Sequence, residues 1–293
     1  MMEIISSQPG IKYYDEPVNI RRENVQRTKL FPEWRDIMPD SQRNDDIVRY
    51  IQDLQKNHYA FLNPVPFRRN HRFSTNRIVF KIHALEHMIN EIKDRCNGQI
   101  LYLLRHPIPT TLSRNELPRL ERFMLSCYHR SAFLDDNQTK EIWNIYCKGS
   151  KLQKGILLWC FENFVPLRYS DTRDWLILTY EELLLNPKKL CQTVANFLEL
   201  PRVDLMIRAI NTPAANIKLS RQDTFDILND TNEQKRRSAM VTKWKAKVSD
   251  ADERSSIDIL ELFGLDSYQY NRFIAHDRHL HSPETAKTLV ELS

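Results

Sequence analysis

Short apolar runs alternate with segments of helical periodicity along most of the chain. The runs typical of strands cover residues 12–15, 77–82, 99–104 and 175–180, and the last two are continuous apolar stretches like those of parallel strands buried on both faces. Helical spacing covers residues 1–8, 45–56, 85–96, a segment from about 109, 152–167 and a segment from 186. Strands that alternate with helices form parallel β-α-β units, so we predict one α/β domain with a central, mostly parallel sheet flanked by helices.

The segment 152–167 has the clearest helical pattern. Its apolar positions include Ile156, Trp159, Cys160 and Phe164, which share one face of a helix. We therefore predict an amphipathic helix here and assign Trp159 to the core.

Composition narrows the class of protein. The chain has 293 residues, of which 41% are hydrophobic, which is enough for a substantial core. No run approaches the length of a membrane span, and the first residues lack the basic and apolar regions of a secretory signal. The five cysteines are widely spaced, odd in number and without a C-x-x-C pair, which fits reduced thiols better than disulfides or a zinc site. We expect a cytoplasmic protein with no membrane span and no metal requirement.

The charge is mildly basic and unevenly spread. The net charge of +5 suits a polyanionic small molecule as well as nucleic acid. Residues 235–247 carry six basic side chains and no acidic one, and they form either part of an anion site or a solvated face. The five glycines form neither a complete phosphate loop nor a dinucleotide-binding fingerprint.

An arginine follows the apolar run 99–104. Arg105 stands at the carboxyl end of this strand, where ligands of open α/β sheets bind. Ser113 follows eight residues later, in what we expect to be the first turns of the next helix. A guanidinium and a hydroxyl placed in this way can hold one phosphate together. The alternative is that Arg105 pairs with a surface carboxylate.

Two further strand ends carry polar side chains. Tyr180 ends the run 175–180, where it is either a binding residue or a core tyrosine with a satisfied hydroxyl. Lys81 and His83 lie two residues apart at the end of the run 77–82, so we expect both side chains on one face. A lysine can stabilise a departing oxygen, and a neutral imidazole can take a proton near pH 7. His83 is otherwise an ordinary surface or core residue, and His87 is a weaker rival.

These segments together resemble the sulfotransferases that use 3′-phosphoadenosine 5′-phosphosulfate (PAPS). The similar features are a strand followed by Arg-x-Pro with a serine at plus eight, a strand followed by Tyr-Glu-x-Leu, and Lys-x-His at a strand end. The resemblance covers about residues 1–270 and implies a three-layer fold like that of P-loop nucleoside triphosphate hydrolases. Residues 271–293 then form a polar C-terminal tail.

The resemblance also implies roles for individual residues. Arg105 and Ser113 would hold the 3′-phosphate of the nucleotide, and Tyr180 would lie beside them. His83 would be the catalytic base, next to Lys81, and Glu16 is a second candidate base because some relatives carry an acidic residue before proline there. The basic stretch with Arg236, Arg237 and Trp244 is similar to a segment that folds over the nucleotide, although the glycine that often follows the basic pair is missing.

One element of the family is missing. The loop that binds the 5′-phosphosulfate follows the first strand, and residues 2–17 resemble the end of the first helix and the segment after it. We therefore expect the first strand and its loop to be absent. Either the recorded start is an internal methionine of a longer, active protein, or the chain is a degenerate nucleotide binder. In both cases residues 1–293 alone should show little or no turnover.

The sequence thus favours transfer of a sulfuryl group from PAPS to a hydroxyl of a small molecule, lipid or carbohydrate, without a metal. An inactive sulfotransferase-like nucleotide-binding protein is the alternative. A nucleic-acid-binding protein is a third and weaker reading, since no recognition motif accompanies the basic stretch. The acceptor and the oligomeric state do not follow from the sequence, because acceptor pockets are lined by variable loops such as 18–76 and 115–150.

Overall fold

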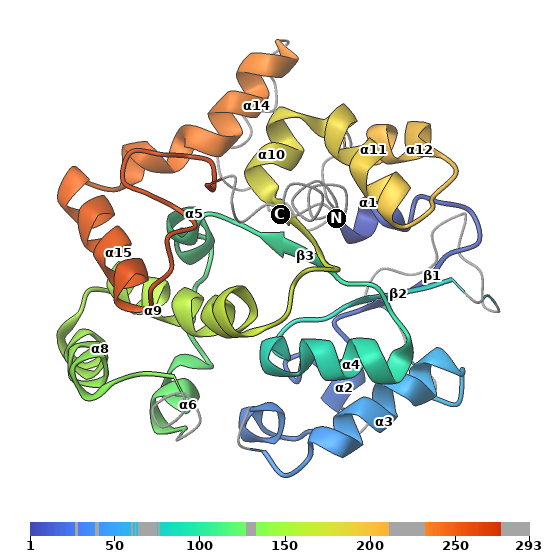
Figure 1. Cartoon of the computed structure of the whole chain (residues 1–293), viewed down its shortest axis with the longest axis horizontal. Coiled ribbons are helices and arrows are strands. Elements are labelled where there is room, and N and C mark those ends of the chain that lie inside the picture. Colours follow the sequence, from blue (N-terminus) through green and yellow to red (C-terminus); the bar gives the residue numbers. More distant parts are fainter. Residues whose placement is uncertain are drawn as a thin grey trace, which may run out of the picture.

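The chain folds into short parallel strands surrounded by helices (Figure 1). The computed structural model describes residues 1–26, 29–38, 41–59, 61, 63, 75, 77–126, 133–210 and 232–276. The strands are β1 (Lys12–Asp15), β2 (Ile78–Lys81), β3 (Leu101–Leu104) and β4 (Leu176–Thr179). The helices are α1 (Met2–Ile5), α2 (Glu23–Gln26), η1 (Trp34–Ile37), α3 (Asn44–Gln55), η2 (Glu86–Met88), α4 (Ile89–Cys96), α5 (Pro107–Leu112), α6 (Leu120–Leu125), α8 (Asp136–Lys148), α9 (Lys151–Phe164), η3 (Val165–Tyr169), α10 (Tyr180–Leu185), α11 (Pro187–Phe197), α12 (Val203–Ile210), α14 (Glu233–Thr242), η4 (Lys243–Lys247) and α15 (Asp250–Leu262).

The strands pair in parallel, as predicted. β1 pairs with β2, and β3 pairs with β4, so that Asp15 lies opposite Lys81 and Leu104 opposite Thr179. In the part of the chain that the structure describes, these are two separate two-stranded sheets rather than one continuous sheet. The α/β class is confirmed, but no described strand joins β2 to β3.

Helices cover the strands on two sides, which gives the predicted layered arrangement. In Figure 1, α1, α10, α11 and α12 lie above the strands and α3 and α4 below them. The upper cluster is apolar and includes Leu176 and Leu178 of β4, and Val79 of β2 and Leu101 of β3 pack against it. The lower cluster joins Tyr14 of β1 to the apolar faces of α3 and α4. The shared upper cluster holds the two strand pairs side by side.

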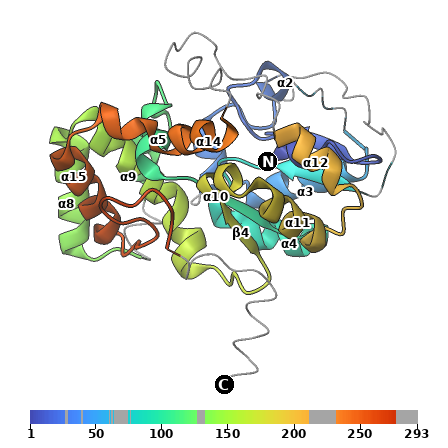
Figure 2. The same cartoon turned by 90° about the horizontal axis from the view of Figure 1, so that it is seen from above.

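The other half of the molecule is helical and is built around α9, which lies beside α5, α8 and α15 (Figure 2). Residues 155–162 of α9 are all buried, together with Phe164, so this helix is enclosed rather than amphipathic. The prediction of a single apolar face is wrong because α5, α6, α8 and α15 all pack on α9. Gly155 lets α5 approach closely, since a Cβ atom at this position would lie 2.1 Å from the Cγ2 of Thr111. The position of α5, which follows Arg105, is therefore set by the core.

No helix within the described ranges is both long and apolar enough to cross a bilayer. The described chain continues to residue 276, and Phe273 packs against Trp244 with ring centroids 5.7 Å apart. The rest of the predicted tail, and the predicted thiol Cys127, lie outside the described residues.

Candidate functional site

Arg105 and Tyr180 meet at the ends of two neighbouring strands. Because Leu104 lies opposite Thr179 in the parallel pair, the residues that follow emerge side by side. The guanidinium of Arg105 lies over the Tyr180 ring, 4.7 Å from its centroid. This stacking orients the guanidinium.

Arg105 has no carboxylate partner in the described part of the chain. Its Nε is buried and makes no hydrogen bond there, which is costly for a charged donor. The backbone of Arg105 is anchored as well, because the indole Nε1 of Trp159 donates a hydrogen bond to the Arg105 carbonyl oxygen at 3.0 Å. Trp159 is therefore both a core residue, as predicted, and an anchor of Arg105. The alternative reading of Arg105, a surface ion pair, is not what the described residues show.

Ser113 lies at the other end of a short helix. The prediction that it occupies the first turns is wrong, because α5 begins at Pro107 and ends at Leu112, so Ser113 is the residue after its last turn. Its hydroxyl is exposed and donates to the Thr110 carbonyl at 2.7 Å. Six residues of α-helix rise by about 9 Å. Arg105 and Ser113 therefore stand at opposite ends of α5.

Glu181 was not singled out from the sequence, yet it ties the site together. Its carboxylate accepts the His106 backbone N–H at 3.0 Å and the Tyr268 hydroxyl at 3.1 Å. Burial raises the pKa of Glu181. The sequence signal that could have identified Glu181 is its position directly after Tyr180. By accepting the His106 N–H, the Glu181 carboxylate fixes the start of α5 beside Tyr180.

His106 is fully buried next to Arg105. Its ring lies 4.7 Å from those of Trp244 and Tyr268, and its Nδ1 accepts the Ile108 N–H at the start of α5. Burial lowers the pKa of His106 to about 3. The ring is therefore neutral at physiological pH.

This buried imidazole predicts a pH dependence of stability. The folded pKa lies below the unfolded value of about 6.5, so stability is complete above pH 6.5 and is lost as the pH falls toward 3. Between pH 7 and pH 5 the expected loss is about 2 kcal/mol of unfolding free energy. His106→Asn keeps an acceptor for the Ile108 N–H but does not titrate. Urea unfolding at both pH values should show a smaller loss in His106→Asn, and equal losses in the two proteins would contradict the assignment.

The predicted basic stretch forms α14 and η4 and lies against the site. Arg237 donates to the Leu184 carbonyl of α10 at 2.9 Å and pairs with Glu233, and Arg236 is half-buried beside it. Trp244 is buried and packs on His106. This segment is therefore not merely a solvated face, since Trp244 contacts the residue that follows Arg105.

Lys81 and Glu16 lie at the ends of β2 and β1 and bind each other. The Lys81 ammonium is 2.7 Å from a Glu16 carboxylate oxygen and 3.1 Å from Asp15. Arg22 pairs with the same two carboxylates. Burial alone would raise the pKa of Glu16, but hydrogen bonds and charge from Lys81, Asn19 and Arg22 lower it to about 2. Glu16 is ionised and fully partnered at neutral pH, and that makes it a weak base.

His83 and Glu16 line one cavity of about 210 Å³. Most of the lining residues carry polar or charged groups, and they come from segments far apart in the sequence: Glu16, Asn19, Arg21, Trp34, His83, Arg114, Glu116, Pro118, Arg119, Leu158 and Glu162. Both loops expected to line the acceptor pocket contribute to it. Arg114 follows Ser113 directly, so α5 connects the Arg105 site to this cavity. His87, the rival histidine, is not among the lining residues.

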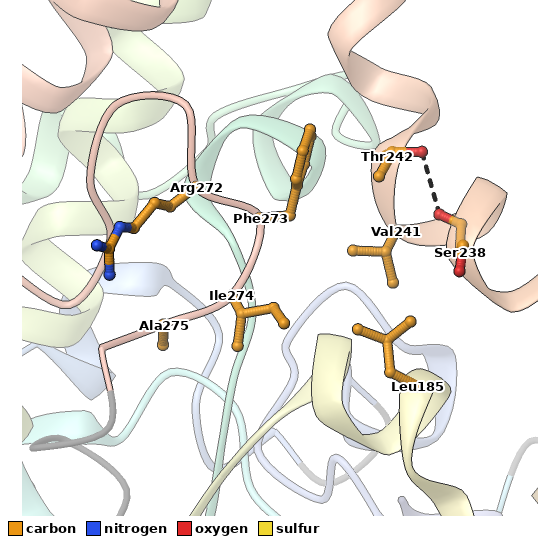
Figure 3. Close-up of a pocket in the computed structure, with 8 residues that line it drawn as sticks. All are labelled: Leu185, Ser238, Val241, Thr242, Arg272, Phe273, Ile274 and Ala275. Atoms are coloured by element: carbon orange, nitrogen blue, oxygen red, sulfur yellow. Dashed lines mark hydrogen bonds between the residues drawn. The ribbon is translucent and has the colours of Figure 1, made fainter.

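A second cavity, of about 450 Å³, lies between α10, α14 and residues 272–275 (Figure 3). The apolar side chains of Leu185, Val241, Phe273 and Ile274 face this space, while Arg272 extends away from it. None of the residues predicted to bind or react lines it. We therefore base the functional site on Arg105 and on the smaller cavity.

Within the described ranges, no group of three or more histidine, cysteine, aspartate or glutamate residues could hold a metal ion.

A family model, the sulfotransferase domain, matches residues 77–259. No curated protein and no solved structure matches the chain. The matched region exceeds half of the chain and contains every predicted site residue except Glu16. The chain therefore belongs to the sulfotransferase-domain family.

Proposed function

We propose that the protein transfers a sulfuryl group from PAPS to a hydroxyl of a polar small molecule. The observation that carries this proposal is Arg105, a strand-end arginine stacked on Tyr180 with a buried Nε that has no hydrogen-bond partner among the described residues. A phosphate oxygen would satisfy this donor by a charge-assisted hydrogen bond. Ser113, Arg236 and Arg237 are further proposed contacts to the nucleotide, with Trp244 supporting them from the core.

The acceptor is proposed to bind in the 210 Å³ cavity. This volume suits a molecule of about one sugar ring, and the lining offers one large aromatic surface, Trp34, among charged and amide groups. A guanidinium nitrogen of Arg114 and the Nε of Arg119 are buried there without a hydrogen-bond partner in the described residues. Such donors favour an acceptor rich in oxygen atoms over a purely apolar phenol or sterol.

His83 is the proposed base. PAPS supplies a sulfuryl group on a phosphate oxygen, and the S–O bond to that phosphate breaks as the acceptor oxygen bonds to sulfur. The His83 imidazole takes the acceptor proton, and Lys81 stabilises charge on the departing oxygen once the nucleotide competes with Asp15 and Glu16 for its ammonium. Adenosine 3′,5′-bisphosphate then leaves.

The alternative proposal is a nucleotide-binding protein without transfer. The ion pairs of Lys81 favour it, because a lysine held by two carboxylates does not stabilise a departing oxygen.

We also propose a cytoplasmic location, which is supported by the free thiols Cys96, Cys147, Cys160 and Cys191.

Transfer is tested directly with ³⁵S-labelled PAPS and two acceptor sets, monosaccharides and simple phenols. We expect label in the saccharides, or in neither set if the protein only binds nucleotide. Labelling of phenols alone would overturn the proposed acceptor class. Because turnover of residues 1–293 is expected to be low, nucleotide binding is measured in parallel.

A further inference from the structure

Ala84, the residue after His83, has a strained backbone. Its φ is +80°, in the left-handed region, although it carries a side chain and is 1% exposed. A non-glycine residue in this region is strained, and it persists only where surrounding contacts impose it. Some part of the structure therefore holds Ala84 in place.

One buried ion pair holds both polar groups of Ala84. The Glu86 carboxylate accepts the Ala84 N–H at 3.2 Å, and a guanidinium nitrogen of Arg119 donates to the Ala84 carbonyl at 3.3 Å. Arg119 and Glu86 bind each other through two hydrogen bonds, of 2.9 and 3.1 Å. Burial alone would raise the pKa of Glu86, but Arg119 lowers it to about 2, so the pair stays ionised.

The ion pair of Arg119 and Glu86 is linked to α9 by a further contact of Arg119. Arg119 is 2% exposed and also reaches Glu162 of α9 at 3.4 Å, and Glu162 binds Arg114 at 2.6 Å. A buried ion pair of this kind adds little stability compared with apolar side chains of equal volume. Its placement on the strained residue next to a cavity-lining histidine points to a role in that cavity, since backbone strain concentrates at functional sites.

We infer that Arg119 and Glu86 are positioning residues for His83. They hold the left-handed turn at Ala84, and this turn directs the His83 imidazole into the acceptor cavity. Neither residue makes or breaks a bond in the reaction. The inference rests on the proposed function only for the role of His83, and its structural part is testable without turnover.

The test replaces the ion pair without leaving a buried charge. The double variant Arg119→Met with Glu86→Met keeps similar side-chain volume and removes both contacts to Ala84, while Arg114 continues to pair with Glu162. Glu86→Gln is a milder variant if the double one does not fold. The readout is the imidazole ¹H–¹³C signal of His83, assigned from the spectrum of His83→Asn.

A control replaces another ion pair, the partly exposed Lys245 and the buried Glu253, by methionines. This pair joins η4 to α15, on the opposite side of the molecule from β2 (Figure 1). We expect the His83 signal to move or split in the Arg119 and Glu86 variants and to stay in place in the control. A folded double variant whose His83 signal coincides with that of the wild type would overturn the inference.

Turnover adds a second readout. The Glu86→Gln variant should lose about 10- to 100-fold in kcat with an acceptor KM within about 3-fold of the wild type, because misplacing a reacting group slows the chemical step. Adding Ala84→Gly should recover part of this loss, since glycine adopts a positive φ without strain. Turnover by the wild type tests the proposed function, whereas the His83 spectra decide the positioning role whether or not turnover is found.

Discussion

In any form of the protein that transfers the sulfuryl group, His83→Ala is expected to lower turnover by about 100-fold or more and to leave nucleotide affinity close to that of the wild type. The variant removes the proposed base, and a positioned general base typically contributes on the order of 100- to 10,000-fold. It removes no phosphate contact, since Arg105 and Tyr180 lie at the ends of β3 and β4, whereas His83 follows β2. The measurement is a pair of assays, sulfuryl transfer with labelled PAPS and calorimetric titration of the nucleotide.

Glu16→Gln is the informative comparison. With a pKa of about 2, Glu16 is a much weaker base than an imidazole at pH 7, so this variant should lose less turnover than His83→Ala. His87→Ala serves as a control for loss of a nearby histidine outside the cavity. If Glu16→Gln abolishes transfer while His83→Ala does not, the acidic residue is the base and our assignment is wrong.

Arg105→Ala is expected to weaken binding of adenosine 3′,5′-bisphosphate by about 30- to 200-fold. This corresponds to about 2–3 kcal/mol, the size of a charge-assisted hydrogen bond lost from a partly buried site. Arg105→Lys should recover only part of the affinity, because an ammonium lacks the fork of the guanidinium and stacks less well on Tyr180. Arg173→Ala, at an exposed surface pair with Asp171, is the control and should leave the affinity unchanged. An unchanged affinity in Arg105→Ala would remove Arg105 from the site.

The sequence predicted the strands well, because each strand is marked by a pattern of adjacent residues. The strand at 12–15 has the same bounds in the structure, and the buried strand predicted at 175–180 is β4, Leu176–Thr179. Continuous apolar runs identify such strands without knowledge of their neighbours. The contact between Arg105 and Tyr180 could not be predicted from the sequence. It requires β3 and β4 to be adjacent, and no local pattern encodes that pairing.

The parts of the site that the sequence missed depend on distant contacts. Arg119 joins Glu86 and Glu162, which are 33 and 43 residues away, and each of these residues alone reads as an ordinary charged position. The enclosure of α9 was missed for a similar reason, since periodicity shows one apolar face and does not reveal the helices that cover the others. Ser113 was misplaced because the length of α5 was not readable from its sequence.

The most direct test of the central claim is a calorimetric titration of residues 1–293 with adenosine 3′,5′-bisphosphate and, in parallel, with adenosine 5′-monophosphate. The two ligands differ only in the 3′-phosphate that Arg105 is proposed to hold. We predict that the bisphosphate binds at least about 10-fold more tightly, since one charge-assisted hydrogen bond is worth about 1.5–3 kcal/mol. Equal affinities for the two ligands, or no binding of the bisphosphate, would contradict the claim.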